Sequence, residues 1–94
     1  ADEAITDIIT VGFENIFVGE EMALIIRTEN KKNKNYIEKI KTAFYDDIFP
    51  RVMVFTSRNL RNVSGKPDRL QFKELLDIYK DCSFGKTIQI VFWK

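Results

Sequence analysis

Histidine is missing from this sequence of 94 residues, and cysteine occurs once, as Cys82. The first absence excludes histidine as a general acid or base, as the partner of a nucleophilic serine or cysteine, and as a metal ligand. A single cysteine cannot form an intramolecular disulfide or a cysteine-rich metal site. We therefore predict no catalytic residues, no cofactor and no metal, and we interpret Cys82 as a half-buried structural thiol.

Glycine-rich phosphate loops are missing as well. Neither G-x-x-x-x-G-K nor G-x-G-x-x-G occurs in the chain, so we expect no mononucleotide or dinucleotide site. The adjacent pair Asp46-Asp47 falls in a segment with helical periodicity, where neighbouring side chains diverge by about 100°. An enzyme would have to rely on carboxylate, lysine or tyrosine chemistry, and this inventory argues against one.

Long apolar runs are also lacking, since none approaches about 18 residues, and we predict no membrane span. The first residues are acidic and lack the basic start of a signal peptide. Together with the single cysteine, this favours an intracellular protein of the cytoplasm or nucleus. Hydrophobic residues make up 45% of the chain, enough for one compact domain spanning residues 1–94.

The periodicity of apolar residues predicts the order (α)ββαβαβ. Residues 3–10 have weak helical spacing, and residues 13–18 and 21–28 read as a hairpin around the two-residue turn Gly19-Glu20. Apolar stripes predict two main amphipathic helices, at 36–48 and 68–82, with Asp68 as the N-cap of the second. Runs of apolar residues predict strands at 51–56 and 87–93.

This order predicts an α+β or small α/β fold with a four-stranded mixed sheet. The strands at 21–28 and 51–56 are apolar on both faces, which is typical of central parallel strands, and 13–18 would form an antiparallel edge. Ubiquitin-like and ferredoxin-like α+β layouts are the alternatives.

The charge distribution is uneven, although the net charge is only +1. Residues 1–21 carry six acidic and no basic side chains, whereas residues 27–73 carry twelve lysines and arginines against five acidic residues. The basic residues concentrate in a first basic loop, 27–35, and a second basic loop, 57–67. Each loop follows a predicted central strand, and in parallel strands ligands tend to bind beyond these carboxyl ends.

We therefore predict an anion-binding edge built from both loops. Its predicted residues are Arg27, Lys31, Lys32, Lys34, Arg58, Arg61 and Lys66. Trp93 and Tyr36 are candidates for base stacking or for an interface, although an aromatic residue in a small domain more often completes the core. The simpler interpretation is that both loops are only solvated connections.

Two functions remain open from the sequence. The first is a small intracellular, non-enzymatic binding or regulatory domain that contacts a polyanion, with nucleic acid as the first choice and an acidic protein surface as the second. The second is a protein-interaction module, self-associating into a homo-oligomer or acting as an adaptor. It would use complementary acidic and basic faces, or an exposed edge strand at 13–18 or 87–93.

Overall fold

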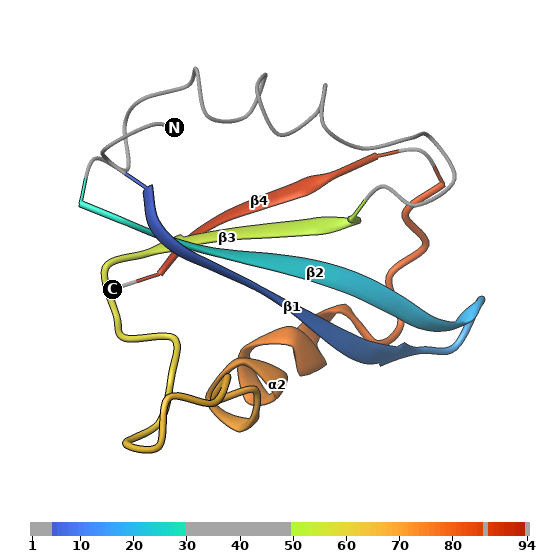
Figure 1. The fold of residues 1–94 in the computed structure, drawn as a ribbon. Helices are drawn as coiled ribbons and strands as arrows, with labels where there is room; N and C mark the ends of the chain where they lie inside the picture. The colour runs from blue at the N-terminus through green and yellow to red at the C-terminus, as the bar shows by residue number, and fades with distance from the viewer. Residues whose placement is uncertain (1–4, 30–49, 86, 94) are drawn as a thin grey trace.

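Four strands form one mixed sheet in the computed structural model, which describes residues 5–29, 50–85 and 87–93 (Figure 1). The strands are β1 (Ile5–Asn15), β2 (Gly19–Thr28), β3 (Val52–Thr56) and β4 (Gln89–Trp93), and they lie side by side in chain order. The pair β1–β2 is antiparallel, and the pairs β2–β3 and β3–β4 are parallel. The predicted mixed sheet is confirmed. Ubiquitin-like and ferredoxin-like sheets insert later strands between earlier ones, so neither alternative layout fits this order.

The predicted helix at 3–10 is wrong, because these residues belong to β1. Ile9, Val11 and Phe13 alternate along this strand and are all buried in the core. The segment is also rich in β-branched residues, whose stiff side chains suit a strand. The period of two and the β propensity therefore outweigh the helical spacing of the isoleucines. The edge strand predicted at 13–18 is displaced toward the N-terminus for the same reason.

The hairpin turn differs from the prediction as well. Asn15 pairs with Gly19, so three residues form the loop, rather than the two-residue turn Gly19-Glu20. Gly19 has a φ of 88°, a left-handed conformation that suits glycine. Three-residue hairpin loops are a common alternative to the two-residue turn.

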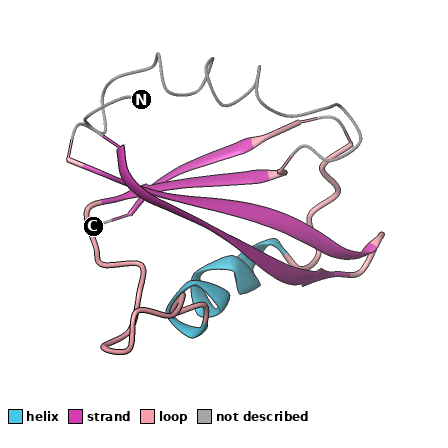
Figure 2. Cartoon of the chain, in the orientation of Figure 1, coloured by secondary structure: helices cyan, strands magenta, loops and turns pink. Residues whose placement is uncertain are grey.

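The prediction of two main amphipathic helices is wrong. The described residues contain one short helix, α2 (Leu70–Leu76), which continues as a 3₁₀ turn, η2 (Asp77–Tyr79) (Figure 2). The other predicted helix, 36–48, lies outside the described residues. The second helix is shorter than 68–82, and its N-cap is Arg69, without a side-chain cap. Asp68 instead accepts a hydrogen bond from the side chain of Gln71, at 3.3 Å.

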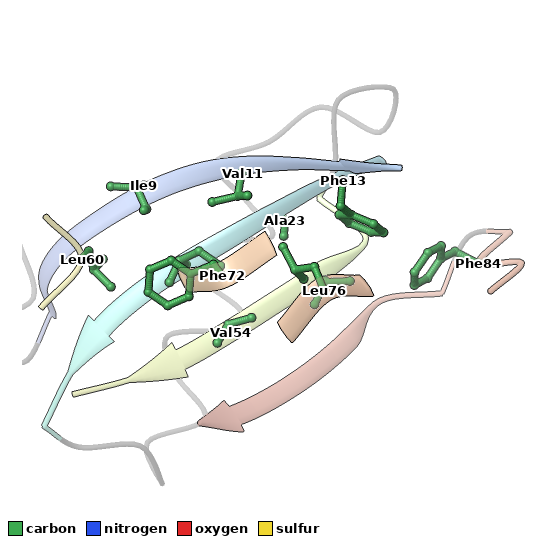
Figure 3. Packing of buried hydrophobic residues seen from close by; sticks show 11 residues of the cluster. Ile9, Val11, Phe13, Ala23, Val54, Leu60, Phe72, Leu76 and Phe84 are labelled. Atoms are coloured by element: carbon green, nitrogen blue, oxygen red, sulfur yellow. The ribbon is translucent and has the colours of Figure 1, made fainter. Parts of the chain in front are cut away.

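The main hydrophobic core lies between α2 and one face of the sheet (Figure 3). The apolar stripe predicted for the second helix is confirmed, because Phe72 and Leu76 are fully buried and Leu75 and Tyr79 pack around them. These residues meet side chains from β1, β2 and β3, together with Leu60 and Phe84 from the connections. The core therefore draws on nearly the whole described chain.

The face of the sheet opposite α2 is buried at its centre too. Leu24 and Ile26 of β2 and Met53 and Phe55 of β3 are all nearly inaccessible to solvent. The prediction that these two strands are central and buried on both faces is confirmed. The two outer strands of this order, β1 and β4, form the edges of the described sheet.

Asn15, at the end of β1, is a buried polar residue whose amide is fully hydrogen-bonded. Its Nδ2 group donates to the backbone oxygens of Tyr79, at 3.2 Å, and Cys82, at 2.8 Å. Its Oδ1 atom accepts from the backbone N–H groups of Phe17 and Val18. The amide therefore ties the hairpin loop to the chain that leaves η2, and the backbone bond from Ile16 N to Lys80 O, at 2.8 Å, strengthens this junction.

We predict that Asn15→Ala lowers the free energy of unfolding by about 2–3 kcal/mol, because it leaves two backbone oxygens and two backbone N–H groups without their partner. Asn59→Ala is the matched control, since Asn59 is exposed and accepts one backbone hydrogen bond, from Arg61. It should cost less than about 1 kcal/mol. Urea denaturation of both variants measures the difference, and equal losses would contradict a special role for Asn15.

Candidate anion-binding site

The parallel strands bring the starts of the two basic loops to one edge of the sheet. Arg27 at the end of β2 is in register with Thr56 at the end of β3, and Thr56 is in register with Trp93 at the end of β4. On the other side, Arg27 is paired with Asp7 of β1. These four residues form one row across the sheet, with their side chains on the α2 face. The row lies where both basic loops begin.

A direct contact joins the starts of the two loops. The Nε atom of Arg27 donates a hydrogen bond to the backbone oxygen of Ser57, at 3.3 Å. The first basic loop is described only as far as Glu29, so the predicted residues Lys31, Lys32, Lys34 and Tyr36 lie outside the described residues. The second basic loop is described throughout and carries the remaining predicted cations, Arg58, Arg61 and Lys66.

The second basic loop is held in shape by its own polar side chains. Thr56 Oγ1 accepts from the backbone N–H of Arg58, and Asn59 Oδ1 accepts from that of Arg61. Farther along, Asn62 Oδ1 accepts from the backbone N–H groups of Ser64 and Lys66. Such side-chain-to-backbone bonds are typical of tight turns. The fully buried side chain of Leu60 then anchors the loop in the core.

Arg58 rests on the only tryptophan of the chain. Its guanidinium carbon lies 4.0 Å from the centroid of the Trp93 ring, a cation–π contact. Phe72 contacts the same ring from the core in an edge-to-face arrangement, at 5.4 Å between centroids. The half-buried ring of Trp93 thus lies between Phe72 of the core and the guanidinium of the exposed Arg58.

Arg61 is engaged differently, because it is paired with a carboxylate. Its Nε and Nη2 atoms donate to the two oxygens of Asp7, at 2.8 and 3.1 Å, and its Nη1 atom donates to the backbone oxygen of Gly65. The hydrogen bond from Arg61, aided by its charge, lowers the pKa of Asp7 below its ordinary value, and Asp7 in turn raises the pKa of Arg61. The pair cancels most of the charge that Arg61 would offer to a ligand.

Asp7 and the hairpin tip were missed by the sequence reasoning. Asp7 was read as part of a helix, and only an alternating reading of residues 5–15 places it in the same row as Arg27. The hairpin tip, defined as Ile16, Phe17 and Val18, was read as strand although all three side chains are exposed, Phe17 by 59%. The preceding Asn15, a residue that favours turns, is the signal that could have identified the tip.

A separate hollow of about 300 Å³ lies at the β1 edge, away from the basic loops. Its lining is Gly12, Phe13, Glu14, Glu20, Lys73 and Asp77. The charges are of mixed sign and exposed, so the hollow does not favour one class of ligand. No group of side chains in the described ranges is arranged to hold a metal ion. A search of the same residues finds no helix with the length and apolarity needed to cross a membrane.

Comparisons with known proteins add no further constraint on function. No protein-family model, curated protein or solved structure matches this chain.

We predict that Asp7 makes a pH-dependent contribution to stability. The folded-state pKa of Asp7 is lowered from 3.8, so the contribution is present above about pH 4 and is lost as the pH falls through the folded-state value. Wild type and Asp7→Asn should therefore differ in their free energy of unfolding near pH 6 and converge at the acidic end of a pH series.

NMR titration of the Asp7 carboxyl tests whether Arg61 is the cause of its lowered pKa. Arg61→Gln should raise the Asp7 pKa, because it removes the bidentate partner. Arg69→Gln is the charge-matched control, since Arg69 donates to the backbone oxygen of Thr10 rather than to a carboxylate. An Asp7 pKa that stays unchanged in Arg61→Gln would contradict the assignment.

Proposed function

We propose that this chain is a small, intracellular, non-enzymatic binding domain, regulatory in role, that contacts the phosphate backbone of a nucleic acid. The contact would be made by cations at the carboxyl ends of β2 and β3. The observation that carries the proposal is the hydrogen bond from Arg27 to Ser57, which places the starts of both basic loops side by side. This arrangement favours a shared surface over two unrelated solvated connections.

The contacts of each cation indicate how much it would contribute to binding phosphate. The guanidinium of Arg58 lies over the Trp93 ring at an exposed position, and a planar guanidinium is suited to bidentate contact with phosphate. Lys66 is exposed on the same loop. Arg61 contributes less than the sequence suggested, because Asp7 is its partner. Arg27 lies between the strands and the loop, and its charge adds to the field of the edge.

This geometry favours recognition of phosphate rather than of bases. Trp93 is already in contact with Arg58 and Phe72. Stacking of a base on Trp93 would compete with the Arg58 contact, so we expect little dependence on base sequence. Affinity should instead depend on salt, because binding releases the counterions of the contacted phosphates.

Charge reversal provides the test. Arg58→Glu with Lys66→Glu should weaken binding to random DNA and RNA oligonucleotides by at least about tenfold at low salt. For the wild type, the logarithm of the association constant should fall against the logarithm of salt concentration with a slope of about −2 or steeper. Fluorescence anisotropy measures both quantities, and the fluorescence of Trp93 reports contact at Arg58 directly.

The matched control is Lys73→Glu with Lys80→Glu. It makes the same change in net charge, at one position on α2 and one just after η2. Lys80 lies beside the hairpin loop, toward the opposite end of the sheet. This variant should bind almost as tightly as the wild type. If both double variants lose affinity equally, overall charge rather than this edge attracts the nucleic acid, and the proposed site is wrong.

A further inference from the structure

Among the described strands, none pairs with the outer edge of β4. The N–H of Gln89 donates to Arg51 O, at 2.8 Å, which directs the backbone of Gln89, Val91 and Trp93 toward β3. Because backbone groups alternate along a strand, those of Ile90 and Phe92 point outward. Within the described part of the chain, no hydrogen bond engages these outward groups.

The side chains of β4 do nothing to protect this edge. Ile90 and Phe92 are exposed by 38% and 57%, respectively, and Phe92 stacks on Phe55 at the face opposite α2. No residue from Gln89 to Trp93 is charged. Exposed edges are ordinarily blunted by charged residues, proline or bulges, and β4 has none of these.

The other edge of the sheet, formed by β1, is protected. Arg69 Nε donates to the outward backbone oxygen of Thr10, at 3.0 Å, and the side chain of Asp7 accepts from the N–H of Ile8. The backbone N–H of Ile16 is bonded to Lys80. Glu14 places negative charge on the strand, and Asp7 carries the ion pair with Arg61. Because the edge of β1 is protected and that of β4 is not, an additional strand should pair with β4.

We propose that β4 pairs antiparallel with β4 of a second copy of this chain, about a two-fold axis at Val91. In this register Ile90 lies opposite Phe92 of the second copy and Phe92 lies opposite its Ile90. These are the residues whose backbone groups point outward, so each pair exchanges two hydrogen bonds and every outward group finds a partner. A second copy is chosen over another protein because this register sets the exposed apolar side chains of Ile90 and Phe92 against each other and opposes no charges.

The side chains fit the same register. A two-fold axis perpendicular to the sheet keeps each face continuous, so Ile90 packs beside the ring of Phe92 from the other copy, a favourable cross-strand pair. The absence of charge from Gln89 to Trp93 leaves no like-charge repulsion at the contact. Two four-stranded sheets thereby join into one continuous sheet. Because β4 is short, the interface is smaller than that of an obligate dimer, and the dimer is reversible.

Sedimentation over a concentration series tests the proposal on the full chain. The wild type should shift from monomer to dimer with rising concentration, and Ile90→Lys should remain monomeric. Phe17→Lys is the matched control, because it makes the same kind of change at the exposed hairpin tip and should dimerise like the wild type. A monomeric wild type at every concentration, or loss of the dimer in Phe17→Lys with its retention in Ile90→Lys, would overturn the proposal.

Cross-linking gives a second test that does not depend on how well Ile90→Lys folds. In a Cys82→Ser background, Val91→Cys places the two new thiols at the axis, where opposed α-carbons lie about 4.5 Å apart, within disulfide reach. It should form a disulfide-linked dimer rapidly under mild oxidation. Phe17→Cys in the same background should cross-link at least about tenfold more slowly. Equal rates would count against pairing through β4.

Discussion

The parallel alignment of β2, β3 and β4 is the constraint on which the other features of this molecule depend. It places the carboxyl ends of three strands at one edge, and so brings Arg27 against Ser57 and Thr56 against Trp93. It also requires a long connection from each strand to the next. The connection between β3 and β4 carries both α2 and the second basic loop, so the element that covers the core also supplies the cations.

Burial and charge are organised by the same row of residues at the carboxyl edge. Toward the core, Trp93 packs on Phe72, and toward solvent it supports Arg58. At the other end of the row, Asp7 neutralises Arg61 and thereby attaches the second basic loop to β1. A charge count along the sequence treats these arginines as equivalent, but Arg58 lies over the ring of Trp93, whereas Arg61 is held in an ion pair with Asp7.

Much of the sheet could be predicted because its strands carry strong signals. Apolar residues on both faces identified β2 and β3 as central, and the connection between them is long enough for the parallel pairing that was predicted. The helices were predicted less well. An apolar stripe marks which residues of 70–79 face the core, but it does not determine where the helix ends. The amide of Asn15 takes up the backbone oxygens of Tyr79 and Cys82, and sequence periodicity cannot reveal a contact between such distant residues.

The candidate site was predictable in position and less so in composition. Turn residues in 57–67 and the apolar strand before them were enough to place a basic loop beside Arg27. The ion pair of Arg61 was not predictable while residues 3–10 were read as a helix, because only the strand register brings Asp7 to that edge. Errors in local structure thus became errors in electrostatics.

The two proposed surfaces meet at β4 without using the same atoms. Trp93 contributes its ring to the platform beneath Arg58, whereas strand pairing uses the outward backbone of Ile90 and Phe92. Antiparallel pairing about Val91 would set Trp93 of one copy opposite Gln89 of the other. The two arginine edges would then face opposite ends of the joined sheet. A short oligonucleotide could reach only one edge, so dimerisation should leave its affinity unchanged. An oligonucleotide long enough to span both edges would bind the dimer more tightly, because its second contact forms at a high effective concentration.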